Sequence, residues 1–424
     1  MPSKSYEKAL SEIYSLDKFG IHLGLERIKR ILALLGNPEK SFRCCLVAGS
    51  NGKGSTVEML GSVLSKNGWK TGSYFSPQVE EFPERIRING KNADRKDIVA
   101  SYLEVKKACS KNDIEATFFE VVTAMALLIF SWRKVKCAVL EVGLGGRQDA
   151  TNACEPEVSA ITSISLEHTD ILGKTEEEIV HEKCGIARKG RALIVGQVNS
   201  QVCAAIEKEC AAIGAKPIFV SDAVKISALG SRDGKYSYRA RLGGNSYRIS
   251  LAAPGKFQVN NSLVALACAV HLGAKKPAIQ KGLSSSCPAY RLQTLSHSPK
   301  VIADCCHNPG AAFAIAHELR RIKGRKVLLF SAMSDKDYKQ VLDILRPFFS
   351  QLVLTEVPLA RAASIQELAD AARRCRFMPI EVKYPGKALI QAKRIAGKEG
   401  TVVIAGSIYL LAGLFGKDKI RIAQ

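Results

Sequence analysis

The sequence lacks several features that would point to particular classes of protein. It contains no internal repeat and no low-complexity tract, which argues against a solenoid or an array of linkers. Its 13 cysteines are scattered and form no CxxC pair, so they do not indicate the disulfide framework of a small secreted domain. We expect reduced, mostly buried thiols. The adjacent Cys305 and Cys306 fit packing better than a redox or metal site, because neighbouring side chains of a strand point in opposite directions.

Signals for a membrane or for export are also missing. The longest uncharged stretch, residues 401–416, is short for a bilayer span, and Gly406 and Ser407 interrupt it, which predicts a strand, a turn and a helix. Residues 1–6 are polar, and no apolar segment typical of an export signal follows them. We therefore expect a cytoplasmic protein that does not bind a membrane.

Positive charge, in contrast, is in excess, with 62 Lys and Arg against 40 Asp and Glu and a formal net charge of +22. Such a charge attracts anions, including ATP, a polyglutamate tail or nucleic acid. The basic residues are spread along the chain, without an Arg-rich arm and without the interleaved aromatic residues of a nucleic-acid surface. A solvated basic exterior is the better interpretation, and we expect no nucleic-acid partner.

The length of 424 residues and the apolar content of 46% predict two domains of the α/β class. In residues 1–295, apolar runs typical of buried parallel strands alternate with helical patterns, and residues 224–251 predict a small appended antiparallel sheet. Residues 295–300 look like a linker, after which a second alternation of strands and helices starts at Val301. We assign residues 296–424 to this second, Rossmann-like domain. The expected strands span residues 44–48, 137–141, 158–164 and 192–195 in the first domain and residues 301–304, 326–330, 351–354 and 401–405 in the second.

A glycine-rich segment lies between the first predicted strand and an amphipathic helix expected at residues 55–66. It consists of Gly49, Ser50, Asn51, Gly52, Lys53, Gly54, Ser55 and Thr56. Backbone N–H groups of such a loop can approach phosphate oxygens, Lys53 can reach the terminal phosphates, and Ser55 can help to hold a magnesium ion. Two residues separate Gly49 from Gly52, where the usual P-loop has four, so the spacing alone also allows an ordinary glycine turn.

Two further positions suit this chemistry. Glu141 ends the apolar strand at the level of the loop, where a carboxylate oxygen could bind Mg²⁺, although a surface acid facing a turn is the alternative. In the second domain, Asn308 and Pro309 form an N-cap and N1 pair, which would place His307 on a tight turn between a strand and a helix. Ligands of such folds bind at the carboxyl ends of strands and between domains, so we expect a cleft there.

The loop GSNGKGST resembles the GTNGKGS loop of folylpolyglutamate and dihydrofolate synthases, which are members of the Mur ligase superfamily. Other segments are similar to motifs of this family, in the same order along nearly the whole chain. They include SP at 76–77, ERIRING at 84–90, EVGLGGR at 141–147, DATN at 149–152, RLQ at 291–293, HNP at 307–309, DKD at 335–337 and GSIYL at 406–410. The sequence departs from the family pattern at Glu167, where the family has Asp, at Cys305–Cys306, at Phe257, and at Tyr290, where a glycine is common.

The resemblance implies ATP and two magnesium ions as cofactors, and it leaves open whether K⁺ also binds. It implies that Lys53, Glu141, His168 and Lys183 are catalytic and that the metal ligands are Ser55, Ser76, Glu141, His168 and Lys183. Lys183 would act as the carbamate formed with CO₂, whose oxygens attract Mg²⁺ where an ammonium would repel it. From the sequence alone, Lys183 is a solvated helix lysine or a phosphate contact, and His168 is a buried, hydrogen-bonded histidine.

The resemblance also assigns ligand contacts. It implies that ATP contacts residues 51–56 and also Asn261, Arg291, Asp304 and His307. It implies that the carboxylate substrate, with its pterin ring, contacts Arg85, Thr117, Phe119 and Asp149. An aromatic face and a carboxylate suit a flat heterocycle with amino groups. The alternative for Phe119 is the protein core, because residues 118–130 predict a mostly apolar helix.

The predicted activity is that of an ATP-dependent ligase that joins L-glutamate to dihydropteroate, to a reduced folate, or to both. The substrate carboxylate would attack the γ-phosphate of ATP, and the amine of glutamate would then attack the acyl phosphate. We expect a monomer. Two alternatives are another Mur-type amino-acid ligase, acting on a carboxylate other than folate, and a non-catalytic nucleotide-responsive module that binds nucleic acid. The second alternative would not need Glu141, His168 and Lys183 together.

Overall fold

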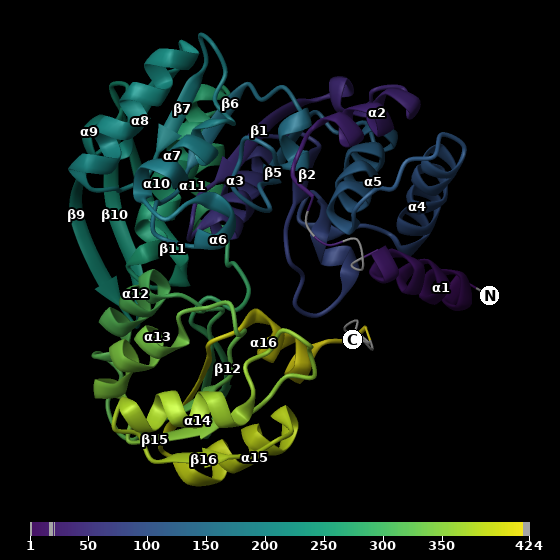
Figure 1. The fold of residues 1–424 in the computed structure, drawn as a ribbon. Helices are drawn as coiled ribbons and strands as arrows, with labels where there is room; N and C mark the ends of the chain where they lie inside the picture. The colour runs from purple at the N-terminus through teal and green to yellow at the C-terminus, as the bar shows by residue number, and fades with distance from the viewer. Residues whose placement is uncertain (1, 17–19, 21, 419–424) are drawn as a thin grey trace.

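The computed structural model describes residues 2–16, 20 and 22–418, which form two α/β domains, one above the other in Figure 1. The first is built on an eight-stranded sheet whose strands are parallel except for two short antiparallel strands at one edge. In sheet order these are β4 (Lys91–Asn92), β3 (Ile86–Ile88), β2 (Thr71–Tyr74), β5 (Cys137–Glu141), β1 (Arg43–Ala48), β6 (Val158–Ile161), β7 (Ala192–Val195) and β8 (Lys216–Phe219). The predicted α/β class is confirmed.

Helices cover both faces of this sheet. They are α1 (Pro2–Tyr14), α2 (Glu26–Leu34), α3 (Lys53–Lys66), α4 (Arg95–Ser110), α5 (Phe118–Trp132), α6 (Thr169–Leu172), α7 (Glu176–Cys184), α8 (Ser200–Ile213), α9 (Val220–Ala223), α10 (Phe257–His271) and α11 (Lys276–Ser285). Side chains alternate along the central strand β1: Cys44, Leu46 and Ala48 pack in the core under α2, α4 and α5, whereas Cys45 and Val47 pack under α3, α10 and α11. Burial on both faces explains why β1 is a continuous apolar run.

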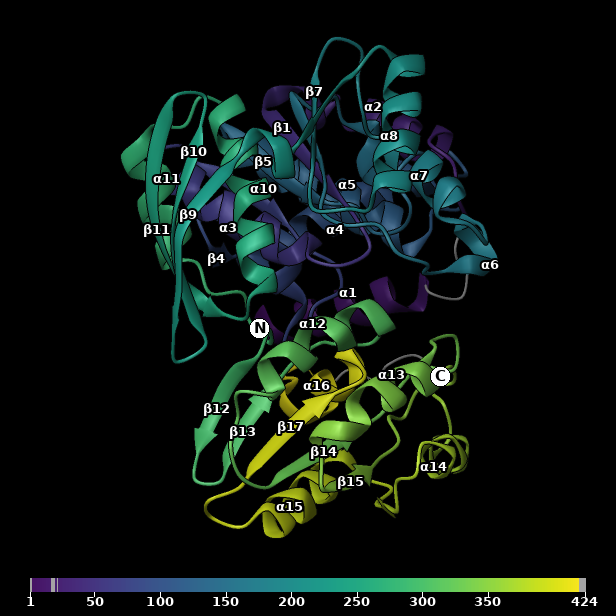
Figure 2. The same ribbon diagram turned by 90° about the vertical axis from the view of Figure 1, so that its left-hand side faces the viewer.

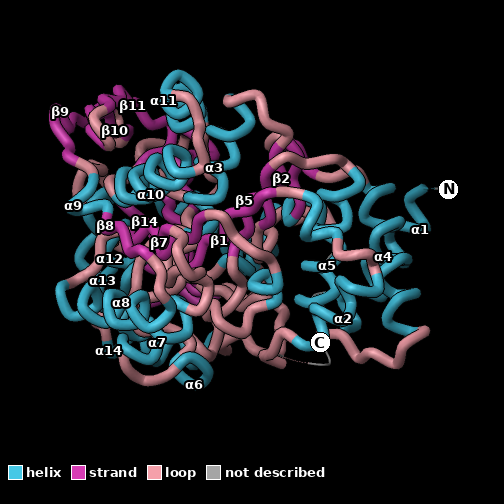
Figure 3. The backbone as a smooth tube through the Cα atoms, turned by 90° about the horizontal axis from the view of Figure 1, so that it is seen from above, coloured by secondary structure: helices cyan, strands magenta, loops and turns pink. Residues whose placement is uncertain are grey.

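The predicted small antiparallel sheet is present. It consists of β9 (Lys225–Arg232), β10 (Lys235–Leu242) and β11 (Asn245–Pro254). Alternate residues of β10 are buried, and Tyr236, Tyr238 and Ala240 pack in the same core as α3 and α10. The small sheet forms one outer side of the molecule and extends toward the second domain in Figure 2, and α1 and α4 lie at the opposite side in Figure 3.

The second domain has a six-stranded sheet, parallel except for its first strand. Its strands, in sheet order, are β12 (Gln293–His297), β13 (Lys300–Ala303), β17 (Thr401–Ala405), β14 (Lys326–Phe330), β15 (Gln351–Leu354) and β16 (Pro379–Glu381), and its helices are α12 (Pro309–Leu319), α13 (Tyr338–Leu345), α14 (Ile365–Arg374), α15 (Pro385–Ala396) and α16 (Ile408–Phe415). Two apolar cores cover its two faces. This is the predicted Rossmann-like alternation of strands and helices.

The prediction of a linker at residues 295–300 is wrong, because this segment belongs to the hairpin of β12 and β13. His297 pairs with Lys300 across it, and Ser296 pairs with Val301. Polar residues and a proline at a tight turn look the same in a sequence as a linker. The division of the chain after residue 295 stays a proposal, and the pairing of β12 favours a boundary a few residues earlier.

The cysteines and the long uncharged stretch have the structures that the sequence predicts. All 13 cysteines are free and most are buried, as predicted, including Cys305 and Cys306. Residues 401–416 form strand β17, a turn and helix α16, also as predicted. Among the described residues, no helix combines the length and the apolar character that crossing a membrane requires.

Candidate active site

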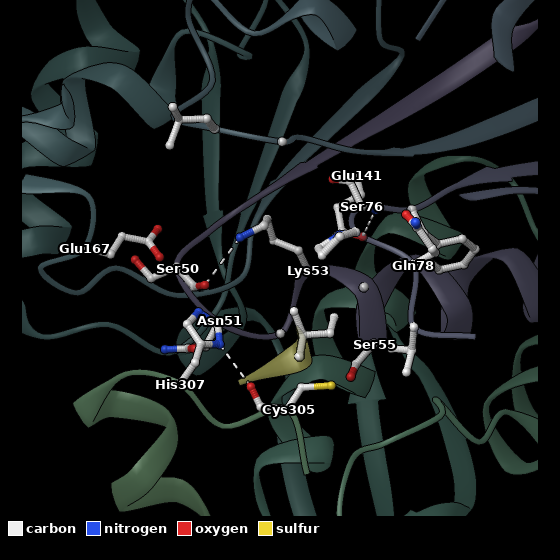
Figure 4. A pocket seen from close by; sticks show the side chains of 18 of the residues that line it. Ser50, Asn51, Lys53, Ser55, Ser76, Gln78, Glu141, Glu167, Cys305 and His307 are labelled. Carbon is white, nitrogen blue, oxygen red and sulfur yellow. Dashed lines mark hydrogen bonds between the residues drawn. The ribbon is translucent and has the colours of Figure 1, made fainter. Parts of the chain in front are cut away.

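A cavity of about 700 Å³ lies between the two domains, where the carboxyl ends of β1 and β5 face the segments that follow β13 and β17. Among its lining residues are the predicted Asn51, Gly52, Lys53, Gly54, Ser55, Ser76, Arg85, Thr117, Phe119, Glu141, Asp149, His168, Asn261, Arg291, Asp304 and His307. Figure 4 shows several of these side chains around the loop that follows β1. The structure therefore brings together residues that are up to 256 positions apart in the sequence, from Asn51 to His307.

The glycine-rich loop wraps around the start of α3. Gly52 is the N-cap of this helix with φ of 88°, and a Cβ at this position would lie 2.3 Å from Oδ1 of Asn261. Glycine therefore meets both a backbone and a space requirement here. The backbone carbonyl of Asn51 accepts hydrogen bonds from the hydroxyls of Thr162 and Ser163 after β6, at 2.6 and 3.0 Å. Free N–H groups at the first turn of a helix that is held in this way are suited to phosphate oxygens.

Lys53 is the first residue of α3, and its ammonium lies over the loop. Its Nζ donates to the carbonyl of Gly49 at 2.7 Å. It also donates to the carbonyl of Ser50 at 3.3 Å (Figure 4). The charge of this ammonium opposes the rise that burial causes in the pKa of Glu141, and it helps to lower the pKa of Glu167. Lys53 therefore acts on two acids from different segments.

Glu141 is buried at the end of β5. Its Oε2 accepts a hydrogen bond of 3.1 Å from the backbone N–H of Ser76 (Figure 4), and a Cβ on Gly54 would lie 3.3 Å from the same oxygen. Burial raises the pKa of Glu141, and the charge of Lys53 opposes this rise. Its carboxylate therefore faces Gly54 of the loop, and its role as a metal ligand stays a prediction.

The donor set near the loop suits one magnesium ion. Mg²⁺ usually takes one or two carboxylates, hydroxyls and waters together with substrate phosphates, so Glu141 and the hydroxyl of Ser55 are sufficient protein ligands. Among the described residues, no three His, Cys, Asp or Glu side chains are grouped closely enough to bind a metal ion without such phosphates.

The predicted second metal site is occupied by ammonium groups. Nζ of Lys183 forms an ion pair of 2.8 Å with Oε1 of Glu167, and both side chains are buried. Nε2 of His168 lies 3.2 Å from Nζ of Lys336. As an ammonium, Lys183 would repel a cation, so these residues suit a second Mg²⁺ only if Lys183 is modified.

The electrostatics of this cluster follow from burial and from its lysines. Burial favours the neutral acid at Glu167, yet the charges of Lys53 and Lys183 together lower its pKa to about 2. Burial, aided by the charge of Lys336, lowers the pKa of His168 to about 4, so that this imidazole is neutral near pH 7. Burial also lowers the pKa of Lys183, and the attraction of Glu167 opposes this effect.

Lys183 itself lies beside the main cavity. It lines a small adjoining cavity of about 20 Å³, which shares Lys53, Glu167 and His168 with the large one. Thr56 is fully buried in α3 and does not line either cavity. Of the predicted site residues, only these two are separated from the main cavity.

The second domain reaches the loop through the start of α12. Nδ2 of Asn308 donates to Oδ1 of Asn51 at 3.0 Å, and its Oδ1 caps the helix by accepting from the N–H of Ala311 at 2.8 Å. The predicted N-cap is confirmed. Nδ1 of His307 lies 2.9 Å from the carbonyl of Cys305, and burial lowers the pKa of His307 (Figure 4).

Asp304 and Arg291 also line the cavity; Asp304 is buried and Arg291 is half-buried. The carboxylate of Asp304 accepts from the N–H groups of Leu292 and Cys306, each at 2.8 Å. It therefore fixes the two segments that carry Arg291 and His307. Arg291 lies between two residues with left-handed backbone, Tyr290 and Leu292, with φ of 54° and 50°.

The predicted pterin residues line the same cavity. A Cβ on Gly143 would lie only 2.4 Å from the ring of Phe119, so the glycine turn after β5 and this ring are in direct contact. Thr117 caps α5 through the backbone N–H of Glu120. The guanidinium of Arg85 donates to Gln78 and lies over the ring of Phe118, 5.1 Å from its centroid.

The carboxylate of Asp149 has protein partners for both oxygens. Oδ2 accepts from the N–H groups of Gly143 and Leu144, and Oδ1 accepts from the N–H and the hydroxyl of Thr151. A carboxylate offers about four acceptor positions, so these four donors use them all. In this arrangement Asp149 shapes the glycine turn, and its role with a pterin stays a prediction.

Sequence reasoning missed two charged residues of the site. Glu167 was noted only as a departure from the family pattern, whereas it is the ion-pair partner of Lys183. Lys336 belongs to the DKD segment, and that motif was the available signal for its place beside His168.

Family models match most of the chain. The Mur ligase middle domain matches residues 47–269, and the Mur ligase glutamate ligase domain matches residues 290–408. The two domains are thus those of a Mur-type ligase. An Escherichia coli dihydrofolate synthase/folylpolyglutamate synthase is 31% identical, with 95% of this chain and 93% of the relative covered. The chain belongs to the family of dihydrofolate synthases and folylpolyglutamate synthases.

Another relative is longer. A probable bifunctional folylpolyglutamate synthase/dihydropteroate synthase of Haloferax volcanii is 30% identical over 96% of this chain, and the chain spans 50% of the length of that relative.

Solved structures agree in fold. The Escherichia coli protein in complex with DHPP and ADP has a TM-score of 0.87 at 30% identity, with 95% of this chain and 96% of that chain covered. A bifunctional folylpolyglutamate synthase/dihydrofolate synthase with Mn, AMPPNP and L-glutamate bound has a TM-score of 0.85 at 30% identity, with 95% and 96% covered.

Proposed function

We propose that this protein is an ATP-dependent ligase that joins the amine of L-glutamate to the carboxylate of dihydropteroate, of a reduced folate, or of both. The observation that supports this most directly is the meeting of Lys53, Glu141 and Arg291 around one cavity between the domains. Relatives of the same fold are known in complex with DHPP and ADP, and with AMPPNP, Mn and L-glutamate. A nucleotide, a divalent metal ion and glutamate are the kinds of ligand that this reaction requires.

The proposed reaction has two steps. An oxygen of the substrate carboxylate attacks the γ-phosphorus of ATP, the bond to the bridging oxygen of ADP breaks, and an acyl phosphate forms. The glutamate nitrogen then attacks the acyl carbon, phosphate leaves, and the nitrogen loses a proton. Lys53 and Arg291 would stabilise the charge on the transferring phosphoryl group, and the loop N–H groups would orient it.

Metal ions would supply further charge neutralisation. Ser55 and Glu141, with Ser76 beside them, would hold one Mg²⁺ with the phosphates of ATP. His168 and Lys183 would hold a second ion if Lys183 carries a carbamate. Burial lowers the pKa of Lys183, which raises the fraction of neutral amine that can attack CO₂.

We assign ATP and the pterin substrate to different parts of the cavity. Asn261, Asp304 and His307 would contact or shape the ATP side. Phe119 and Arg85 would meet the pterin and its chain on the other side, with Thr117 and Asp149 holding the segments around them. A cytoplasmic monomer is part of the same proposal, and gel filtration tests its size.

The direct experiment incubates the pure protein with ATP, Mg²⁺, L-glutamate and either dihydropteroate or tetrahydrofolate. We expect release of ADP together with a product that is heavier by one glutamate residue. Lys53→Ala should abolish both signals, whereas Lys66→Ala, at the far end of the same helix, should not. Release of ADP without the heavier product would reject the folate proposal and favour another Mur-type ligase.

A further inference from the structure

Residues 76–85, called here the 76–85 loop, connect the phosphate side of the cavity to the pterin side. Ser76 donates to Glu141, and Gln78 accepts from Arg85, so both ends of the loop carry cavity residues. Inside the loop, the carboxylate of Glu84 accepts from three successive N–H groups, those of residues 79–81, at 3.1 to 3.3 Å. The loop is therefore a preformed unit that can dock as one piece.

This unit is docked on the second domain. Val79 is buried in the core that covers one face of the six-stranded sheet, together with Tyr290 and Leu410. Oε1 of Glu80 accepts from the hydroxyl of Tyr290 at 2.8 Å, and Oε2 pairs with Nζ of Lys417 at 2.7 Å. The backbone N–H of Lys417 also donates to the carbonyl of Glu80 at 2.7 Å.

Tyr290 is the centre of this contact. Its ring is buried and stacks on Phe415 of α16, with 5.9 Å between ring centroids. Its backbone has φ of 54°, which side chains other than glycine rarely adopt, and it directly precedes Arg291. A strained backbone at a functional segment persists only where the surrounding contacts hold it, and here the stack and the hydrogen bond to Glu80 do so.

We propose that Tyr290 is a positioning residue that, through Glu80, holds the 76–85 loop on the second domain and so couples the ATP side of the cavity to the carboxylate-substrate side. A glycine at this position, which the family pattern favours, could not make either side-chain contact. The coupling is then a property of this chain's own residue. The inference rests on the proposed function, because it names the substrate side of the same site.

The test compares Tyr290→Phe and Glu80→Gln with the wild-type protein. Tyr290→Phe keeps the ring stack and removes the hydroxyl. We expect the KM for the pterin substrate to rise about ten-fold, the change that loss of one hydrogen bond to a charged group can produce, while kcat stays within about two-fold. Tyr384→Phe, at an exposed tyrosine of the same domain, is the matched control and should change none of these values.

A double variant separates a positioning role from a general loss of structure. If Tyr290 acts through Glu80, Tyr290→Phe combined with Glu80→Gln should raise this KM no more than the stronger single change does. Effects on KM that multiply, or a Tyr290→Phe protein with an unchanged KM, would overturn the proposal.

Hydrogen exchange gives a readout that needs no turnover. In the protein without ligands, the amides of residues 79–81 should exchange faster in Tyr290→Phe than in wild type or Tyr384→Phe. If the ligase assay fails but this exchange increases, the contact stands and the proposed function falls. Equal exchange rates would overturn the contact itself.

Discussion

Replacing Lys183 with Met should destabilise the protein in a way that depends on pH. The ion pair of Lys183 and Glu167 is 2.8 Å long, and the two side chains are 2% and 8% exposed. The neighbouring positive charges lower the pKa of Glu167 from its ordinary value of 4.5 to about 2. Each pKa unit corresponds to about 1.4 kcal/mol, so the pairing of Glu167 contributes about 3 kcal/mol to the unfolding free energy.

The sign of the effect fixes the pH window. A carboxylate with a lowered pKa in the folded state stabilises the protein fully above its ordinary pKa of 4.5, and this contribution is lost as the pH falls toward 2. Because Lys53 also lowers this pKa, removal of Lys183 leaves part of the contribution in place. We expect Lys183→Met to lower the unfolding free energy by about 2–3 kcal/mol at pH 7, with a smaller difference from wild type at pH 3.

Urea denaturation at pH 7 and at pH 3 measures both values. Lys189→Met, at an exposed lysine after α7, is the matched control and should stay within about 0.5 kcal/mol of wild type. Lys183→Met combined with Glu167→Leu removes the unpaired charge and should recover most of the stability, but no turnover. A Lys183→Met protein that is as stable as wild type at pH 7 would refute the reasoning.

Two further predictions concern the space beside Phe119 and the contact between the domains. Gly143→Ala would bring a Cβ to 2.4 Å from the Phe119 ring, so steady-state assays should show at least a ten-fold higher KM for the pterin substrate and an unchanged KM for ATP. Gly386→Ala, at a glycine with open space around it, is the control and should behave as wild type. Asn308→Ala removes both the cap of α12 and the hydrogen bond to Asn51. We expect the unfolding free energy, measured by thermal unfolding, to fall by about 1 kcal/mol, and ATP binding, measured by calorimetry, to weaken. A variant with wild-type values for both would contradict this.

The sequence was most informative where burial alone decides the structure. The strands β5, β7, β14, β15 and β17 were predicted with their observed bounds, because each is an apolar run buried on both faces. The short edge strands β3 and β4 were missed, because two or three residues are too few to show a periodicity. The end of β12 and its turn to β13 were mistaken for a linker, because they have the same polar composition as one.

At the site, the sequence predicted candidate ligands but not how their side chains pair. Lys183 lies in a helix that begins with three glutamates, which is typical of a solvated helix. It is buried because α7 packs on the glycine turn after β5, where a Cβ on Gly146 would lie 3.0 Å from Cα of Lys183. Such packing between distant segments has no local signal, and so the partner of Lys183 could not be predicted.

The pair of Lys183 and Glu167 also determines how a carbamate could form. Reaction of the Lys183 amine with CO₂ replaces the positive charge of the side chain with a negative one. The nitrogen that reacts, Nζ of Lys183, lies 2.8 Å from Oε1 of Glu167. Glu167 has a pKa of about 2 in the present pair, so it is an anion at neutral pH, and two anions at this distance in a buried site are unstable without a cation between them.

Formation of the carbamate should therefore require a divalent metal ion, since Mg²⁺ would bind the carbamate and Glu167 together and remove their repulsion. Carbon-13 NMR with labelled bicarbonate tests this linkage. We expect a carbamate signal that grows with the Mg²⁺ concentration and is absent in Lys183→Met, while Glu167→Gln, which lacks the second anion, should form the carbamate with much less Mg²⁺. A wild-type signal of equal strength with and without Mg²⁺ would show that Glu167 does not oppose the modification, and the proposed linkage of metal and CO₂ would be wrong.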